Sequence, residues 1–185
     1  IRTAVVDEAR GAVTFGIGSG IVWDSDATDE YEECLLKAAV LGRRPPPFEL
    51  LETMRWTPGQ GFFLLQRHLQ RLSDSADYFG FVCRPDEVMR ALHETVAGGA
   101  TPLRVRLVVD SHGKIRVEHA PLQASPSPLR VGLAVDPIDP ADTFLYHKTT
   151  NRAVYERARR AGLDDVILRN PKGEVTEATI ANIVV

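Results

Sequence analysis

The sequence predicts an α+β fold in which most strands pair with a neighbour in the chain. The clearest observation is the order of segments after residue 47, which runs strand, strand, helix, helix, strand, strand, unlike a doubly wound sheet. The second is the set of short Gly-, Pro- and Asn-containing turns between apolar runs. The third is the composition, 44% hydrophobic and 25% charged, which is ordinary for a globular protein.

Residues 1–41 are predicted to form three strands and a helix. Short apolar runs separated by turns indicate strands, and the glycines within residues 16–20 allow unusual backbone angles. Polar residues 24–26 offer oxygens that cap the helix. The elements are the strands Arg2–Asp7, Ala12–Gly16 and Ile21–Trp23 and the helix Thr28–Leu41.

Three consecutive prolines mark a boundary in the chain. Residues 42–47 read Gly-Arg-Arg-Pro-Pro-Pro, which stops a helix and favours an extended, semi-rigid spacer. We therefore predict a first segment over residues 1–41, a proline-rich linker over 42–47 and a separate domain over 48–185.

The domain after the linker is predicted from alternating apolar residues in strands and from amphipathic helices closed by proline or glycine. Its predicted strands are Phe48–Trp56, Gly61–Leu65, Leu103–Val109, Lys114–His119, Leu129–Val135, Asp165–Arg169 and Glu174–Thr176. Its predicted helices are His68–Phe79, Pro85–Val96 and a third that follows Arg152 and ends near Ala161.

Composition restricts the partners that we expect. The formal net charge of -3 gives no basic surface for nucleic acid, and no apolar run approaches the roughly 18 residues that span a bilayer. The first residues lack the basic and apolar regions of a signal peptide. Cys34 and Cys83 match no metal or redox spacing, and we expect buried thiols in a reducing compartment. A cytoplasmic protein without a membrane or nucleic-acid partner follows.

The first candidate site is an acidic helix beside a glycine turn. Glu30, Glu33 and Lys37 lie at i, i+3 and i+7, within one stripe of a helix. Two carboxylates one turn apart can hold a magnesium ion, the lysine can meet a substrate carboxylate, and the glycines of residues 16–20 can bring N–H groups to an anion. The alternative is a solvated, capped helix with a Glu33–Lys37 ion pair.

The order of these residues resembles the C-terminal end of the chorismate-utilising enzymes, most closely aminodeoxychorismate synthase component I. The resemblance rests on Ile1-Arg2-Thr3, on residues 16–26 and on residues 30–38, and it covers residues 1–41. It implies magnesium ligands and a chorismate pocket, and for the whole protein a glutamine amidotransferase partner that supplies ammonia. The implied magnesium ligands are Glu30 and Glu33, and the implied pocket residues are Arg2, Gly18, Gly20 and Lys37.

The second candidate site contains a lysine, an arginine and a glutamate. Lys148 stands between an apolar run and a helix start, where partial burial lowers an amine pKa and favours a Schiff base. Pyridoxal phosphate also needs a carboxylate near its ring nitrogen and a cation at its phosphate, which Glu177 and Arg71 can supply. The alternatives are a solvated lysine, an arginine turned away from the Leu69/Leu72 face and a glutamate facing water.

Three segments resemble fold-type IV, branched-chain-aminotransferase-like pyridoxal-phosphate enzymes. These are residues 68–76, 147–152 and 173–183, in the order and near the spacing of that family. The resemblance implies that Lys148 is the Schiff-base residue and proton shuttle, that Glu177 meets the pyridine nitrogen and that Arg71 binds the phosphate. The Asn-Arg pair after the lysine is the variant associated with aminodeoxychorismate lyases.

The neighbouring synthase-like segment favours the lyase within this family. A synthase that makes aminodeoxychorismate is economically joined to the enzyme that removes pyruvate from it and forms p-aminobenzoate. The alternatives are a class IV aminotransferase for D- or branched-chain amino acids and a non-catalytic fragment that keeps the fold. The resemblance further implies a homodimer. In this family a further region with phosphate contacts follows the glutamate segment, so we expect a parent protein that extends beyond both ends of this chain.

Overall fold

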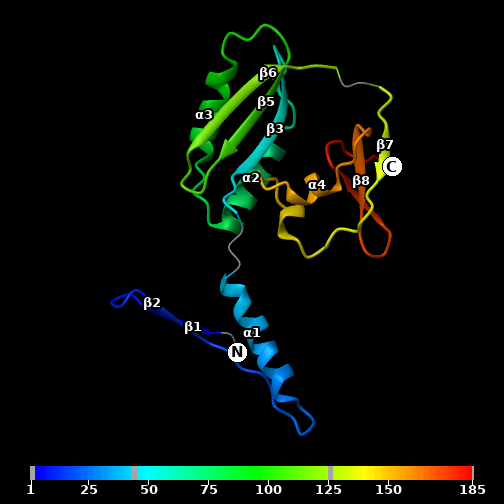
Figure 1. Ribbon diagram of the computed structural model, residues 1–185. Coiled ribbons are helices and arrows are strands. Elements are labelled where there is room, and N and C mark those ends of the chain that lie inside the picture. Colours follow the sequence, from blue (N-terminus) through cyan, green and yellow to red (C-terminus); the bar gives the residue numbers. More distant parts are fainter. Residues whose placement is uncertain (1–2, 43–45, 125–126, 185) are drawn as a thin grey trace. The chain divides into compact units, whose positions relative to one another are not determined.

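The computed structural model describes residues 3–42, 46–124 and 127–184. It separates into two compact units, Ile1–Pro46 and Pro47–Val185. Figure 1 labels most of the helices and strands of both units. Each unit is described by itself below.

The first unit is a hairpin followed by a helix. Strand β1 (Thr3–Asp7) pairs antiparallel with β2 (Ala12–Gly16) in continuous register from Thr3↔Gly16 to Asp7↔Ala12. Helix α1 (Ala27–Gly42) begins after Asp26, whose Oδ1 accepts hydrogen bonds from the backbone N–H of Thr28 at 2.8 Å and of Asp29 at 3.2 Å. This is the side-chain cap that the sequence predicted, because the first N–H groups of a helix have no partner within it.

The third predicted strand of this unit, Ile21–Trp23, is wrong. The backbone there turns instead of extending: the N–H of Ser25 bonds to the carbonyl of Val22 at 3.1 Å, and the N–H of Val22 bonds to Ser25 Oγ at 3.0 Å. These bonds occupy groups that a strand would offer to a ladder. The described part of the unit is therefore β-β-α, where β-β-β-α was expected.

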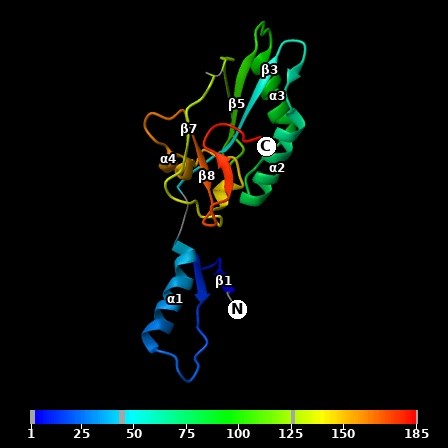
Figure 2. The same ribbon diagram turned by 90° about the vertical axis from the view of Figure 1, so that its right-hand side faces the viewer.

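The second unit contains a four-stranded antiparallel sheet with two helices on one face (Figure 2). Its strand order is β4-β3-β5-β6, and β3 and β5 pair over seven positions, from Leu50↔Val109 to Trp56↔Leu103. The elements are β3 (Leu50–Thr57), β4 (Gly61–Phe62), α2 (Leu65–Phe79), α3 (Pro85–Val96), β5 (Leu103–Val109) and β6 (Ile115–Pro121).

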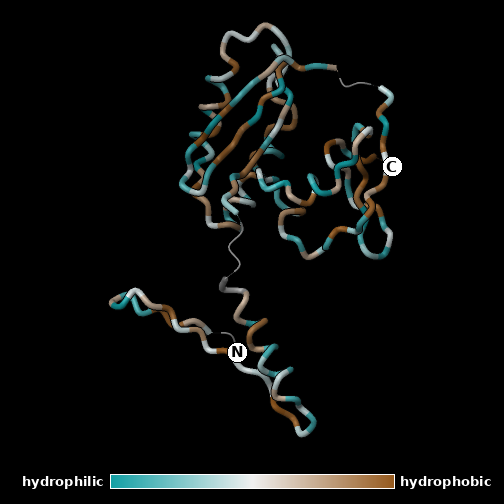
Figure 3. Tube along the Cα trace, viewed as in Figure 1, coloured by the Kyte–Doolittle hydropathy of each residue, from teal (hydrophilic) through white to brown (hydrophobic). Residues whose placement is uncertain are grey.

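Alternate residues of the two central strands form the main core. Leu50 and Met54 of β3 and Val105 and Leu107 of β5 are buried against the apolar faces of α2 and α3, which contribute, among others, Leu92. Figure 3 shows hydrophobic residues along β5 and along a strand of the second sheet, β8 (Asp165–Arg169). Complete burial of one such side chain is worth about 1.5–3 kcal/mol, so this cluster provides a rigid base for residues at the strand ends.

The largest boundary difference in this region lies at the turn into α2, whereas the bounds of β3 and β6 differ from the prediction by one or two residues. The strand expected over Gly61–Leu65 is only two residues long, and α2 begins at Leu65 instead of His68. Leu64 adopts a left-handed conformation with φ 53°, which ends the extended run and turns the chain into the helix. The change adds one turn to α2.

The remaining strands form a three-stranded sheet. β7 (Val131–Leu133) pairs parallel with β8, and β8 pairs antiparallel with β9 (Val175–Ala178). The connection from β7 to β8 carries a 3-10 turn, η1 (Thr143–Leu145), and helix α4 (Ala153–Ala158). The β8–β9 hairpin is confirmed, whereas the third predicted helix is shorter than expected. The parallel pair was not foreseen, because it is closed by a long crossover and not by a local turn.

Candidate functional site

The Lys148 segment is held against the start of β3 by backbone hydrogen bonds. The carbonyl of Lys148 accepts from Leu51 N–H at 2.9 Å, and Thr150 N–H donates to the carbonyl of Glu49 at 2.8 Å. Glu49 N–H donates in turn to Thr150 Oγ1 at 2.9 Å. These bonds fix the lysine backbone where the crossover segment meets the four-stranded sheet.

His147 fixes the same segment to helix α2. Its Nδ1 lies 3.0 Å from Ser75 Oγ, its ring stacks on Tyr78 with centroids 4.4 Å apart, and its edge meets Phe79 at 4.8 Å. Burial lowers the pKa of His147, which favours the neutral ring in this aromatic setting. Lys148 is therefore restrained by contacts on both of its sides.

The amine of Lys148 lies in a mixed field of charges. Burial lowers the pKa of Lys148 most, the charges of Arg71 and Arg152 lower it further, and Glu52 and Glu177 act in the opposite direction. A lowered pKa makes the neutral amine more available, and the neutral amine is the form that attacks a carbonyl carbon. The structure thus brings Lys148 together with the other two residues predicted for the second site, Arg71 and Glu177.

Arg71 is held in place by a buried carboxylate that the sequence analysis did not identify. Glu52 on β3 is 1% exposed and accepts from Arg71 Nε at 2.7 Å and Nη2 at 2.6 Å. His68 Nδ1 lies 2.7 Å from the same carboxylate. Within the described chain Nη1 of Arg71 makes no hydrogen bond, so part of the guanidinium can still bind an anion.

One polar face of α2 contacts both Glu52 and His147. His68, Arg71, Ser75 and Tyr78 recur at spacings of three and four residues, which places them on one helix face. The first two contact Glu52 and the last two contact His147. The sequence did contain a sign of this role. Side chains alternate between the two faces of β3, and Glu52 is a charged residue on the inward face, between Leu50 and Met54.

Glu177 projects from β9 and receives a hydrogen bond from α4. The hydroxyl of Tyr155 donates to Glu177 Oε2 at 3.0 Å. The guanidinium of Arg152 stacks on the Tyr155 ring at 4.4 Å and donates through Nη2 to the carbonyl of Thr179 at 2.5 Å. The start of α4 and the end of β9 are therefore joined beside Glu177. Tyr155 was also missed by the sequence analysis.

A buried aspartate shapes the loop that follows β9. Asp165 at the start of β8 is 4% exposed and accepts hydrogen bonds from the hydroxyl of Thr179 at 2.5 Å and from Ala181 N–H at 2.8 Å. Desolvation raises the pKa of Asp165, but the hydrogen bonds from Thr179 and from backbone N–H groups outweigh it and leave the pKa lowered. The carboxylate is thus kept charged in a buried position.

These residues fit pyridoxal phosphate. The cofactor needs an amine for a Schiff base, a carboxylate for its ring nitrogen and a cation for its phosphate, and Lys148, Glu177 and Arg71 have these chemical types. The charges of Arg71 and Glu177 both act on the Lys148 amine. The donor set of the site therefore matches the three needs of the cofactor.

The first unit forms an open hollow at its glycine turn. The hollow, with a volume of about 610 Å³, is lined by Thr3, Phe15, residues 16–20 and Lys37. Lys37 Nζ donates to the carbonyl of Gly18 at 3.0 Å and pairs with Glu33 at 2.5 Å. Gly18, Gly20 and Lys37, which the sequence resemblance assigns to a chorismate pocket, line this hollow, and that role stays a prediction. Arg2 lies outside the described residues.

Glu30 and Glu33 lie one turn apart on α1 with different partners. Glu30 Oε1 accepts from Ser25 Oγ at 2.7 Å, whereas its Oε2 is buried without a hydrogen-bond partner in the structure. The nearby hydroxyls of Ser19 and Ser25 lower the pKa of Glu30, although only Ser25 has hydrogen-bond geometry. Over residues 3–42, 46–124 and 127–184, no group of three His, Cys, Asp or Glu side chains is arranged around a common point.

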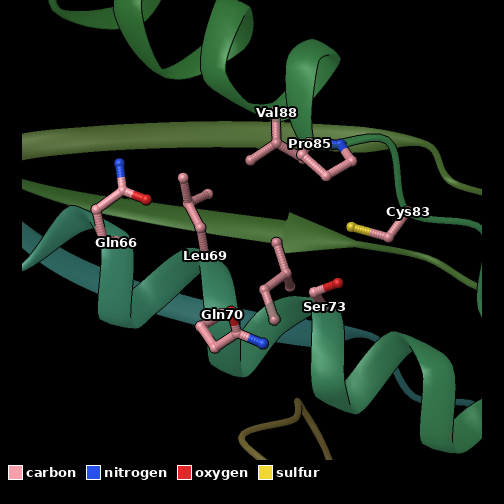
Figure 4. Close-up of a pocket in the computed structure, with 8 residues that line it drawn as sticks. Gln66, Leu69, Gln70, Ser73, Cys83, Pro85 and Val88 are labelled. Carbon is pink, nitrogen blue, oxygen red and sulfur yellow. The ribbon is translucent and has the colours of Figure 1, made fainter.

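A second, smaller pocket of about 220 Å³ lies between α2 and α3 (Figure 4). Leu69 and Leu72 are among the residues that line it, and Cys83 lies at one end. Burial is the main factor that raises the pKa of the Cys83 thiol, which disfavours the nucleophilic thiolate. This pocket contains none of the predicted site residues.

None of the described helices is both long enough and apolar enough to cross a bilayer.

Residues 49–185 match the family model described as amino-transferase class IV, and residues 1–43 match the model described as chorismate binding enzyme. A fission-yeast (Schizosaccharomyces pombe) protein named "Putative aminodeoxychorismate lyase" is 30% identical over 129 residues, which cover 65% of this chain and 56% of that protein. The chain thus spans little more than half of this curated relative.

Solved structures share the fold of the second unit. A Mesorhizobium loti protein named "Putative amino-acid aminotransferase" has a TM-score of 0.66 and 36% identity, covering 72% of this chain and 67% of its own. A Legionella pneumophila protein named "Putative 4-amino-4-deoxychorismate lyase" has a TM-score of 0.58 and 20% identity, covering 71% of this chain and 56% of its own. The α+β fold predicted from the sequence is confirmed as that of the class IV aminotransferases.

Proposed function

The chain belongs to the class IV aminotransferase family, and from that premise we propose that its second unit is a pyridoxal-phosphate-dependent lyase acting on 4-amino-4-deoxychorismate. The observation that carries the proposal is the partly buried Lys148 amine, whose pKa is lowered by burial and then by Arg71, with Glu177 also acting on it. The products are p-aminobenzoate, a precursor of folate, and pyruvate.

Three residues hold the cofactor in this proposal. Lys148 would bind it through a Schiff base, Arg71 would bind its phosphate with the part of the guanidinium that Glu52 leaves unused, and Glu177 would meet its ring nitrogen. When bound, the cofactor supplies an electron sink that stabilises negative charge on the substrate carbon bearing the amino group.

Lys148 also moves the proton. Once the substrate amino group had displaced Nζ from the cofactor, the freed amine would take the proton from the ring carbon that bears the amino group, because a lowered pKa leaves more of the amine neutral and able to accept one. The bond between the ring and the enolpyruvyl oxygen breaks, with its electron pair leaving on oxygen. Return of that proton to the methylene carbon of the released enolate would give pyruvate, and the ring would become aromatic. No other reactant is required, since the two products together contain the atoms of the substrate.

The choice of a lyase rests on the family match of the first unit of the chain and on the name of one relative. The first unit matches chorismate binding enzymes, and the fission-yeast relative carries a lyase name. The alternative is an aminotransferase for D- or branched-chain amino acids, which the name of the Mesorhizobium relative favours. Incubation with aminodeoxychorismate, and separately with D-alanine and 2-oxoglutarate, distinguishes them: p-aminobenzoate forms only with a lyase, and L- or D-glutamate only with an aminotransferase.

For the whole protein we propose a fusion with an aminodeoxychorismate synthase. In this proposal Glu30 and Glu33 bind magnesium, and Arg2, Gly18, Gly20 and Lys37 line the chorismate pocket. The buried, unpaired oxygen of Glu30 supports a cation ligand at that position. A glutamine amidotransferase would supply ammonia to the synthase, and the lyase would act as a homodimer.

The first experiment is the visible absorption spectrum of the chain with pyridoxal phosphate, before and after borohydride reduction. We expect a Schiff-base band that becomes covalently trapped, that is absent in Lys148→Ala and that is unchanged in Lys172→Ala, whose lysine lies in the exposed β8–β9 turn. The same test is repeated on a chain extended past Val185. Absence of the band from both chains would sink the pyridoxal-phosphate assignment.

A further inference from the structure

Tyr155 contacts only one of the two oxygens of Glu177. Its hydroxyl donates to Oε2 at 3.0 Å, and no described residue hydrogen-bonds to Oε1. A carboxylate with one oxygen fixed by a donor has less rotational freedom than one held only by its own side chain. The second oxygen remains available to a positively charged N–H group.

The tyrosine ring is itself held from two sides. It packs against the second core, which contains Val166 and Leu168, and the Arg152 guanidinium stacks on it at 4.4 Å. Arg152 also donates to the carbonyl of Thr179, two residues after Glu177. The Tyr155 hydroxyl and the Glu177 carboxylate are therefore both tied to residues 177–179, at the end of β9 and the start of the following loop.

The hydroxyl of Tyr155 acts as a donor throughout the physiological pH range. Burial, and then the charge and the hydrogen bond of Glu177, raise the pKa of Tyr155 to about 12. A phenol that stays protonated cannot serve as a base at neutral pH. Its contribution is a permanent hydrogen bond to a carboxylate, the stronger, charge-assisted kind.

We propose that Tyr155 is a positioning residue for the cofactor, which holds Oε2 of Glu177 through its hydroxyl and leaves Oε1 to bind the protonated ring nitrogen. The inference rests on the proposed pyridoxal-phosphate function. It adds a residue from α4 to the site. Packing needs only the aromatic ring, which a phenylalanine would also supply, so the proposal gives the Tyr155 hydroxyl a separate role.

The test is a double-mutant cycle on cofactor affinity. Dissociation constants for pyridoxal phosphate are measured for the wild type, Tyr155→Phe, Glu177→Gln and the double variant. Loss of a hydrogen bond to a charged group predicts roughly tenfold weaker binding for Tyr155→Phe. Because the hydroxyl acts through Glu177, the same substitution has no effect in the Glu177→Gln background. Equal penalties in both backgrounds would mean that the Tyr155 hydroxyl acts independently of Glu177, and would overturn the proposal.

Tyr146→Phe is the matched control for loss of a hydroxyl. The Tyr146 hydroxyl donates to the carbonyl of Pro140 at 2.8 Å and not to Glu177. We expect its affinity for pyridoxal phosphate to stay within about twofold of the wild type, the change expected when no contact to the ligand's partners is lost. Thermal unfolding of each variant checks that the chain remains folded.

A measurement without cofactor separates the contact from the function. The ¹³Cζ resonance of Tyr155 is followed up to pH 11, while circular dichroism verifies that the chain is folded. We expect a neutral phenol throughout in the wild type and the onset of ionisation at lower pH in Glu177→Gln. An identical titration in both would disprove the hydrogen bond.

If the titrations differ but the wild type and its extended form bind no pyridoxal phosphate, the contact stands and both the function and the positioning role fail. If the wild type binds but the cycle is additive, only the positioning role fails.

Discussion

Glu52 occupies a position that hydrophobic patterning assigns to an apolar residue. It lies between Leu50 and Met54 on the inward side of β3, yet its carboxylate is almost fully buried and bonded to Arg71 and His68. Burial of a carboxylate is unfavourable unless its oxygens are hydrogen-bonded. The arrangement is explained if the carboxylate fixes Arg71 for an anion, because a lone half-exposed arginine would otherwise sample many rotamers.

Glu52→Gln should lower the free energy of unfolding and the affinity for pyridoxal phosphate together. The substitution keeps the size of the side chain but removes the charge that two donors share. We expect a loss of about 2 kcal/mol, toward the low end for a buried ion pair because Arg71 is half exposed to solvent. Urea unfolding and cofactor titration measure the two effects.

Glu49→Gln is the matched control for this prediction. Glu49 also accepts two hydrogen bonds from an arginine, Arg116, at 2.7 and 2.9 Å, but its side chain is 26% exposed. Solvent screening should hold its effect below about 1 kcal/mol. Equal losses for the two variants would contradict the argument that burial of Glu52 makes its pair important.

At the scale of elements, the site depends on how the end of β9 is attached to the start of β8. Asp165 accepts from a hydroxyl and from three backbone N–H groups, those of Val166, Ile180 and Ala181. The Asp165 carboxylate therefore supplies hydrogen bonds that strand pairing would otherwise give to the loop after β9. This attachment lies close to Glu177 and to the Thr179 carbonyl that anchors Arg152.

Asp165→Asn should destabilise the second unit by about 2 kcal/mol, because an amide weakens hydrogen bonds that a carboxylate accepts. The pKa of Asp165 is lowered on folding, so its contribution is complete above the unfolded value of about 3.9 and is lost as pH falls through the folded value. The difference between wild type and variant in urea unfolding should therefore be constant from pH 5 to 8 and shrink toward pH 3.

The neighbouring residue provides the comparison. Asp164 bonds to Arg130 at the surface, and Asp164→Asn should change the free energy of unfolding much less than Asp165→Asn does, because solvent screens the exposed pair. A larger effect at Asp164 than at Asp165 would show that the loop after β9 is held by something other than the buried carboxylate.

At the scale of the whole molecule, the two units differ in how they are stabilised. The second has two clusters of buried apolar side chains, one under each sheet. In the first, no side chain described in residues 3–39 is fully buried, and Val5, Val6 and Val13 are exposed. An isolated two-stranded hairpin is marginally stable in water, so this unit has little packing of its own to hold it.

Native-state hydrogen exchange should reveal this difference. We expect amides in the β1–β2 ladder to exchange more than about a hundredfold faster than those in the β3–β5 ladder, since local opening of an unpacked hairpin requires little free energy. Amides of β8 serve as a second reference within the packed unit. Equal protection of β1 and β5 would show that the first unit is stabilised by burial that its own residues do not supply.

The sequence by itself determined the α+β class, most elements and the residue types of the site. Helix α3, strand β5 and strand β8 have the predicted bounds, because local periodicity and proline or glycine signals act over a few residues. Lys148, Arg71 and Glu177 were identified as candidates because their local segments resemble known ones, and their roles stay predictions.

Only the tertiary structure decided which residues support them. Glu52, Tyr155 and Asp165 lie 19, 22 and 14 residues from the partners they bind, and no local pattern encodes contacts at such separations. The strand at Ile21–Trp23 failed for the same reason, because an apolar run becomes a strand only where another strand offers its backbone groups. Pairing and burial are properties of the assembled chain, and they bring the charges of Arg71 and Glu177 close enough to act on the pKa of the Lys148 amine.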